Sequence, residues 1–163
     1  MHIHFIGIGG IGVSALAKYH LAKGASISGS DLTPSEITAE LARLGARIVV
    51  GAHAPLNIPL ETGAVVHTAA VARSNLELRE AKRRKIAIQS YAQALGDLTR
   101  QFRTVTVSGA HGKSTTTALV SLACEEGGLD PTVSIGTKLK EFGNSNFRNG
   151  LGSFLILEAD EWN

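Results

Sequence analysis

Two glycine-rich segments constrain this chain more than any other feature, because each follows a short apolar run and opens an amphipathic stretch. The first is Gly7-Ile8-Gly9-Gly10-Ile11-Gly12, and the second, about 100 residues later, is Gly109-Ala110-His111-Gly112-Lys113-Ser114. A glycine-rich turn between a strand and a helix lets the backbone approach a phosphate closely and directs the amides of the helix N-terminus toward it. The sequence therefore predicts two strand–turn–helix units that bind phosphate groups.

Apolar runs alternate with amphipathic stretches along the whole chain, which predicts an α/β fold of βαβ units with parallel sheets. The expected strands are 3–6, 25–29, 47–50, 64–68, 86–88, 103–107, 131–135 and 154–157. The expected helices are 10–23, 34–44 (with Thr33 as cap and Pro34 as first residue), 75–85, 92–98 and one from the second glycine segment to 124. Residues 136–152, rich in Gly, Asn and Lys, are expected to form a loop. We expect a Rossmann-like domain over 1–100 and the first part of a phosphate-loop domain over 101–163.

Composition excludes several classes of protein. Sixteen basic and fourteen acidic residues are too evenly balanced for a nucleic-acid-binding surface over the whole chain. No apolar run reaches the ~18 residues of a membrane-spanning helix, and the first residues lack the features of a signal peptide. The single cysteine, Cys124, excludes an intrachain disulfide and is expected in the core. These features favour a cytosolic location.

The first glycine segment matches the pattern G-x-G-x-x-G through Gly7, Gly9 and Gly12. Asp31 follows 19 residues after Gly12, where a nicotinamide-binding protein places the carboxylate that holds the ribose hydroxyls. Two alternatives remain open from the residues alone. The glycines could form only a tight turn, and Asp31 could cap the helix that follows it.

The second glycine segment carries groups suited to a nucleoside triphosphate. Lys113 can place a cation on the terminal phosphates, Ser114 can offer a hydroxyl to Mg²⁺, and the backbone amides can surround the phosphates. The loop is a variant, because Val107 stands where the usual pattern has its first glycine. Glu158 ends the last expected strand and suits Mg²⁺, with Asp160 and Glu161 as further candidates and an exposed acidic turn as the alternative.

Other polar residues are less specific. His111 is expected to orient the second loop or simply to be tolerated there, with an acid/base role as the alternative. The remaining histidines show no metal-ligand spacing. Lys138, Lys140 and Arg148 could either reach an anionic substrate or form a solvated face.

The combination of motifs resembles the Mur ligase family of peptidoglycan synthesis over the whole chain. The motifs are H-F-I-G-I-G-G-I-G-V-S-A-L-A from His4, S-G-S-D from Ser28, S-G-A-H-G-K-S-T-T-T from Ser108, G-L-D-P-T from Gly128 and E-A-D-E from Glu158. Within the family they are most similar to members that add L-alanine to UDP-N-acetylmuramate. The resemblance implies a UDP-sugar-binding first domain, and a second domain that binds ATP and Mg²⁺.

The resemblance also implies site residues, with the turn at 67–70 lining the UDP-sugar pocket. The implied substrate-binding residues are Gly7, Gly9, Gly10, Ile11, Gly12, Ser30, Asp31, Thr68 and Ala69. The implied ATP-binding residues are Gly109, Ala110, His111, Gly112, Lys113, Ser114 and Thr115. Lys113 and Glu158 would be catalytic, and Ser114 and Glu158 would serve magnesium.

The implied reaction is ATP-dependent amide formation through an acyl phosphate. Family members are much longer, so we expect this chain to be part of a longer protein, to be inactive by itself, and to self-associate through an exposed sheet edge. Trp162-Asn163 departs from the usual Ser-Asp of the alanine-adding members. Tripeptide-recycling relatives carry an aromatic residue there, so they are the nearest alternative.

Alternatives from other classes explain less of the sequence. A nicotinamide-binding regulatory module would account for the first glycine segment but not the second. A non-catalytic UDP-sugar-binding domain would not need Lys113, Ser114 and Glu158. A phosphate-loop GTPase would need an N-K-x-D motif, which the sequence lacks, and would leave the first 100 residues unexplained.

Overall fold

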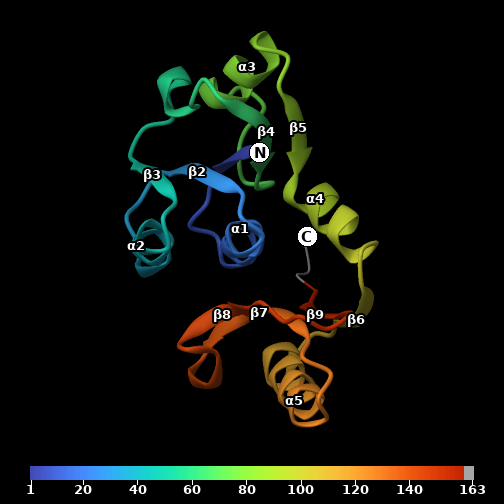
Figure 1. Cartoon of the computed structure of the whole chain (residues 1–163). Helices are drawn as coiled ribbons and strands as arrows, with labels where there is room; N and C mark the ends of the chain where they lie inside the picture. Colours follow the sequence, from blue (N-terminus) through green and yellow to red (C-terminus); the bar gives the residue numbers. More distant parts are fainter. Residues whose placement is uncertain (160–163) are drawn as a thin grey trace. The chain divides into compact units, whose positions relative to one another are not determined.

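The structure is a computed structural model that describes residues 1–159. The chain divides into two compact units, Met1–Leu95 and Gly96–Asn163, each built around its own β-sheet (Figure 1). The α/β class predicted from the sequence is confirmed. Within the described residues, no helix has the length and apolar character needed to cross a membrane.

The sheet of the first unit has the strand order β3-β2-β1-β4-β5, and all of its neighbouring strands are parallel. Its strands are β1 (His2–Ile6), β2 (Ser26–Asp31), β3 (Arg47–Val50), β4 (Thr62–His67) and β5 (Ala87–Ser90). The direction of winding reverses between β1 and β4. In open parallel sheets, ligands bind at this point, outside the carboxyl ends of the strands.

Helices cover both faces of this sheet. They are α1 (Ile11–Ala22), α2 (Glu36–Arg43), the short 3₁₀ helix η1 (Pro55–Asn57), α3 (Leu76–Arg83) and α4 (Tyr91–Thr99), which crosses the division between the units. In Figure 1, α1 and α2 lie together on one face, and α3 lies on the other.

The two faces of β1 form two layers of core, because successive side chains of a strand point to opposite sides. Ile6 is buried in a cluster with Ile58, Val65 and Leu78 on the side of α3. Phe5 is buried on the opposite side, where its ring centroid lies 6.4 Å from that of His20 in α1. The residue before Ile6 on the α3 side is therefore His4, a polar side chain inside the core.

The start of α2 differs from the expected one. The helix begins at Glu36, and its cap is Ser35 instead of Thr33. The Thr38 amide donates to Ser35 Oγ at 3.2 Å, and the Ser35 amide donates to Thr38 Oγ1 at 2.9 Å. This reciprocal pair satisfies two amides that the helix cannot satisfy itself. It moves the helix start two residues beyond Pro34.

The sheet of the second unit has the strand order β6-β9-β7-β8. Its strands are β6 (Arg103–Val107), β7 (Thr132–Leu139), β8 (Ser145–Arg148) and β9 (Phe154–Glu158), and α5 (Lys113–Glu126) packs on one face. The core between them holds Val133, Ile135 and Ile156. Cys124 packs against this core and is half-buried, close to its expected place.

The expected loop over residues 136–152 is wrong. Strand β7 continues to Leu139, a 3₁₀ turn η2 (Lys140–Phe142) follows, and β8 returns antiparallel to β7. Gly143 and Asn144 make the reversal with positive φ values of 69° and 58°. The polar composition hid this hairpin, because its strand carries Asn146, a buried polar residue.

Strand β6 is an edge of the second sheet, and Val105 at its centre is 38% exposed. An edge strand presents unpaired backbone groups to which another chain can pair. The self-association expected from the sequence stays a prediction, which light scattering during size-exclusion chromatography would test.

Candidate phosphate-binding sites

The first glycine segment lies at the carboxyl end of β1 and is held by two consecutive residues at the end of β2. The amides of Gly7 and Ile8 donate to the carbonyl oxygen of Ser30 at 2.8 Å and 3.1 Å. The amide of Gly9 donates to Asp31 Oδ2 at 2.8 Å. Three successive amides of the loop are therefore fixed by Ser30 and Asp31.

Close packing explains why glycines occupy this loop. Gly7 has a φ of 79°, and a Cβ atom there would lie 2.9 Å from Thr68 Cγ2. A Cβ atom on Gly9 would lie 2.8 Å from Asp31 Oδ2, and one on Gly12 would lie 2.6 Å from the Tyr91 hydroxyl. Real Cβ atoms do not approach other atoms so closely. A side chain at any of these positions would displace the neighbouring group.

The loop leads into the N-terminus of α1, which is suited to an anion. Gly10 occupies the cap position with no side-chain hydrogen bond, it is exposed, and the first turn from Ile11 contains no acidic residue. The amides of a helix's first turn have no partner within the helix and carry a partial positive charge. The amides of Gly12 and Val13 belong to this turn.

The other residues predicted for the first site gather around the same loop. Ser30 and Asp31 end β2, while Thr68 and the exposed Ala69 follow β4 directly. Since β2 and β4 both lie parallel beside β1, their carboxyl ends meet at the glycine segment. The structure therefore brings the predicted substrate-binding residues to one end of the first sheet.

The carboxylate of Asp31 braces the loop. Besides the Gly9 amide, it accepts the Thr33 amide at 3.3 Å through Oδ1. Both oxygens thus face the backbone of the same unit. The proposed contact of the Ser30-Asp31 turn with a nucleoside stays a prediction.

The second glycine segment joins β6 to α5. Gly109 has a φ of 151°, and Gly112 caps α5 with a φ of 75°. The half-buried Lys113 side chain donates from Nζ to the Gly109 carbonyl at 2.7 Å, across the loop. The side chain of Lys113 therefore bridges the loop, from the first turn of α5 back to Gly109.

The two residues predicted to serve magnesium contact each other. Ser114 donates from Oγ to Glu158 Oε1 at 2.8 Å, and the amide of Gly136 donates to Glu158 Oε2 at 2.7 Å. Hydroxyl and carboxylate oxygens are the ligands that Mg²⁺ prefers, with phosphates and water completing its shell. Among the residues that the structure describes, no group of three or more His, Cys, Asp or Glu side chains could hold a metal.

The remaining loop residues have simple environments. Ala110, His111 and Thr115 are exposed, and Gly112 accepts the Thr116 amide at 2.9 Å. Asp160 and Glu161, the other acidic candidates, lie outside the described residues, as do Trp162 and Asn163.

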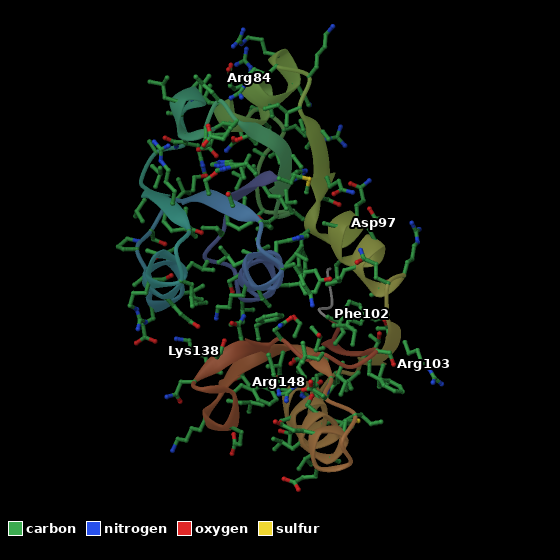
Figure 2. The ribbon with its side chains drawn as sticks, viewed as in Figure 1. Arg84, Asp97, Phe102, Arg103, Lys138 and Arg148 are labelled. Carbon is green, nitrogen blue, oxygen red and sulfur yellow. The ribbon has the colours of Figure 1, made fainter. Side chains whose placement is uncertain are left out.

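Arg148 has a structural role that neither sequence interpretation anticipated (Figure 2). Its guanidinium lies 2.9 Å from Glu125 Oε1 and 2.8 Å from Asp130 Oδ1, and it donates to the Pro131 carbonyl at 2.8 Å. These contacts tie β8 to the end of α5 and the start of β7. Lys138 is half-buried and Lys140 is exposed, and their roles stay open.

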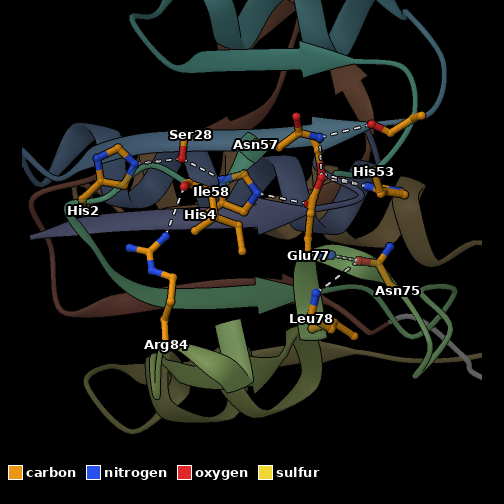
Figure 3. Close-up of polar contacts among 12 residues, drawn as sticks. His2, His4, Ser28, His53, Asn57, Ile58, Asn75, Glu77, Leu78 and Arg84 are labelled. Carbon is orange, nitrogen blue, oxygen red and sulfur yellow. Dashed lines mark hydrogen bonds and ion pairs between the residues drawn. The ribbon is translucent and has the colours of Figure 1, made fainter. Parts of the chain in front are cut away.

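Sequence reasoning missed a buried polar cluster centred on Glu77 (Figure 3). Glu77 is fully buried near the start of α3. Its Oε2 atom accepts from Ser30 Oγ at 2.6 Å and lies 3.2 Å from His4 Nε2. Its Oε1 atom accepts from Asn57 Nδ2 at 2.6 Å and lies 3.2 Å from His53 Nδ1. One carboxylate thus joins β1, β2, the segment around η1, and α3.

The hydrogen bonds decide the charge of this carboxylate. Burial by itself would raise the pKa of Glu77, but the hydrogen bonds from His4, Ser30 and Asn57 outweigh burial and lower the pKa from 4.5 to about 2. The cluster extends from His4 to Ser28, whose Oγ lies 2.8 Å from His4 Nδ1. The signal in the sequence that could have pointed to this cluster is the start of α3, where Asn75 caps the helix by accepting the amides of Glu77 and Leu78.

Two strand–loop–helix turns, each at the carboxyl end of a parallel pair of strands, define an α/β protein with two candidate phosphate-binding loops. Residues 2–103 match the family model described as "Mur ligase family, catalytic domain". The chain belongs to the Mur ligase family.

The chain is similar in sequence to proteins named UDP-N-acetylmuramate–L-alanine ligase. It is 49% identical to the UDP-N-acetylmuramate–L-alanine ligase of Thiobacillus denitrificans and 46% identical to that of Anaeromyxobacter dehalogenans, each over 98% of this chain and 34% of the relative. The chain thus spans about a third of the length of these relatives. A crystal structure of UDP-N-acetylmuramate–alanine ligase from Thermotoga maritima matches with a TM-score of 0.89 at 33% identity, over 97% of this chain and 37% of that one.

A second solved structure names a different activity. It is the UDP-N-acetylmuramate:L-alanyl-gamma-D-glutamyl-meso-diaminopimelate ligase of Neisseria meningitides, with a TM-score of 0.87 at 26% identity. The match covers 98% of this chain and 52% of that one.

Proposed function

We propose that this chain provides the UDP-sugar site and the phosphate loop of an ATP-dependent ligase that joins L-alanine to UDP-N-acetylmuramate. The observation that supports the proposal is the pair of glycine loops, each between a strand and a helix, in a chain whose relatives are named UDP-N-acetylmuramate–L-alanine ligase. The first loop lies at the switch point of its sheet. In the second, Ser114 donates to Glu158, and Lys113 donates to the Gly109 carbonyl.

In the first unit, the diphosphate of the UDP-sugar would lie against the glycine loop at the N-terminus of α1. The amides of Gly12 and Val13 would donate to it, and the helix dipole would offset part of its charge. Thr68 and Ala69 would line the pocket from the end of β4. Ser30 and Asp31 would hold the loop in place and lie near the uridine.

In the second unit, the phosphates of ATP would lie in the loop from Gly109 to Thr115. Lys113 would exchange its contact with the Gly109 carbonyl for the terminal phosphates, where its charge offsets theirs. Ser114 and Glu158 would hold Mg²⁺, which supplies further charge neutralisation when it is bound.

The reaction follows from the weak electrophilicity of a carboxylate. A carboxylate oxygen of UDP-N-acetylmuramate would attack the γ-phosphorus of ATP, and ADP would leave, which gives an acyl phosphate. The amine of L-alanine would then attack the acyl carbon, and the C–O bond to phosphate would break after the amine has lost a proton. The residues of this chain would act by positioning the phosphates and by stabilising their charge.

Calorimetric titration of the chain tests the proposal. We expect saturable binding of UDP-N-acetylmuramate and no binding of NAD⁺, with Mg-ATP as a third, parallel titrant. Binding of NAD⁺ without the UDP-sugar would replace the proposal by a dinucleotide site. Failure of the UDP-sugar to bind at all would remove its main support.

The tripeptide-recycling ligase is the second candidate. Trp162 in the acidic motif favours it, and so does the similarity to the Neisseria structure. Both candidates share the UDP-sugar, so binding of that ligand does not separate them. Phosphate release driven by the tripeptide but not by L-alanine, measured on the full-length gene product, would favour the second candidate.

A further inference from the structure

The glycine loop of the first unit depends on one residue for two of its amides. The Ser30 carbonyl accepts from both Gly7 and Ile8, at 2.8 Å and 3.1 Å. The position of the Ser30 peptide therefore sets where the loop begins. An amide displaced by a few tenths of an ångström no longer points at the position that a phosphate oxygen would occupy.

The side chain of Ser30 is fixed separately from its carbonyl, by a residue near the start of α3. Ser30 is fully buried, and its Oγ donates to Glu77 Oε2 at 2.6 Å. A hydrogen bond to an ionised carboxylate is shorter and stronger than one between neutral groups. Glu77 thus fixes the Ser30 side chain, and the Ser30 carbonyl fixes the start of the glycine loop.

Glu77 is itself held firmly. It is fully buried, and its oxygens contact His4, His53 and Asn57 in addition to Ser30 (Figure 3). Its own amide donates to the Asn75 cap at 2.8 Å. A carboxylate that contacts three other segments of the chain is a rigid reference point for the end of β2.

We propose that Glu77 is a positioning residue for the diphosphate loop and acts through Ser30. The inference rests on the proposed function, because it assigns the loop to a nucleoside diphosphate. Glu77 does not touch the ligand. Its role is to fix the Ser30 peptide, and through it the Gly7 and Ile8 amides, before the ligand arrives.

Glutamine does not reproduce this carboxylate, because one of its two terminal atoms is a donor. With its NH₂ group on one side it would face the Asn57 Nδ2 donor. With its NH₂ group on the other side, the Ser30 hydroxyl would have to accept a hydrogen bond where it now donates one. Glu77→Gln therefore weakens the link to Ser30 while keeping the size of the side chain. Ser30→Ala removes the link from the other end.

The first test uses amide spectra of the ligand-free chain labelled with ¹⁵N. We expect Glu77→Gln and Ser30→Ala to shift the same resonances, those of Gly7, Ile8 and Gly9. The matched controls are Glu80→Gln, on the same helix but paired with Arg83, and Ser26→Ala, at the exposed start of β2. The controls should leave the three resonances in place. Unchanged loop resonances in a folded Ser30→Ala protein would overturn the proposal, even if Glu77→Gln failed to fold.

The second test measures affinity by calorimetry for UDP-N-acetylmuramate and for uridine. A positioning role predicts a loss of roughly tenfold for the UDP-sugar in both variants. For Glu77→Gln, which leaves every residue of the proposed UDP-sugar site in place, it also predicts an unchanged affinity for uridine, which has no diphosphate. Variants that are less stable but bind the UDP-sugar like the unmodified chain would show that Glu77 serves stability alone. If the unmodified chain does not bind the UDP-sugar, the proposed function fails, and the amide spectra still decide whether Glu77 positions the loop.

Discussion

Ser114 and Glu158, 44 residues apart in the sequence, are joined by a hydrogen bond of 2.8 Å between the serine hydroxyl and the carboxylate. Ser114 lies in the first turn of α5, and Glu158 ends β9. Because β9 lies parallel beside β6, the strand end and the loop after β6 meet at the same edge of the sheet. The same carboxylate accepts the Gly136 amide, so three segments converge on one oxygen-rich point.

Gly136 is required for this arrangement, and its replacement should weaken the binding of Mg-ATP. A Cβ atom on Gly136 would lie 2.9 Å from Glu158 Oε1. We expect Gly136→Ala to displace the carboxylate and to lower the affinity for Mg-ATP about fivefold, measured by calorimetry. Gly96→Ala is the control, since nothing lies within 4 Å of the added methyl group. Equal affinities in the two variants would contradict the prediction.

Lys113 should be needed for the nucleotide but not for the fold. Its ammonium group donates to the backbone carbonyl of Gly109 at 2.7 Å. We expect Lys113→Met to lower the affinity for Mg-ATP by roughly tenfold or more, because a charge-assisted contact to phosphate is lost. The affinity for UDP-N-acetylmuramate, which we propose that the first unit binds, should not change. Lys82→Met, at an exposed position of α3, serves as the control.

The pKa of Glu77 predicts a specific acid sensitivity. The pKa in the folded state, about 2, lies below the ordinary value of 4.5, so the ionised carboxylate stabilises the fold above about pH 4.5. This stabilisation is lost as the pH falls toward 2. The free energy of unfolding of the unmodified chain should fall between about pH 6 and pH 3. In Glu77→Gln, which lacks the carboxylate, we expect this fall to be smaller by roughly 2 kcal/mol.

Urea unfolding at the two pH values measures this difference. Glu126→Gln, at an exposed carboxylate near the end of α5, is the control and should follow the unmodified chain. A pH profile of Glu77→Gln that is parallel to that of the unmodified chain would show that another group controls the acid sensitivity.

Arg148 should contribute to stability and not to ligand binding. Its guanidinium joins Glu125, Asp130 and the Pro131 carbonyl, but both carboxylates are partly exposed, so solvent weakens the ion pairs. We expect Arg148→Ala to lower the free energy of unfolding by about 1 kcal/mol. The affinity for Mg-ATP should stay unchanged. If Arg148→Ala instead lost affinity for Mg-ATP without losing stability, a contact between Arg148 and the substrate would be the better explanation.

The parts of the fold that the sequence predicted are those with local causes. The glycine loops could be located because a strand, a tight turn and a helix start follow one another within a few residues. The order of strands and helices followed from the same alternation. The hairpin of β7 and β8 was missed because its turn at Gly143-Asn144 and its polar strand look like a loop.

The polar cluster around Glu77 could not be predicted for a different reason. Its contacts join residues 20 to 73 positions apart, and no spacing along the chain marks them. His4 lies in an apolar strand, where it has no partner within the same segment. Only the register of β1 between β2 and β4, with α3 packed above it, brings these side chains together. Candidate site pairs with a motif on each side, such as Ser114 and Glu158, were easier to find.

Gly9 provides the sharpest test of the first loop. Its amide donates to Asp31 Oδ2 at 2.8 Å, and an added Cβ atom would lie at the same distance from that oxygen. Gly9→Ala must therefore push the carboxylate away and break the bond that fixes the third amide of the loop. We expect the affinity for UDP-N-acetylmuramate to fall about tenfold.

The control for Gly9→Ala is Gly63→Ala in β4, where the nearest atoms would lie 3.7 Å and 3.8 Å from the new methyl group. Gly63→Ala adds the same methyl group to the same unit, so it reports the effect of the substitution without the displacement of Asp31. Its affinity for the UDP-sugar should equal that of the unmodified chain. If Gly9→Ala also binds the UDP-sugar with unchanged affinity, the brace between Asp31 and the loop has no part in binding. The ligand would then rely on the helix N-terminus and the turn after β4.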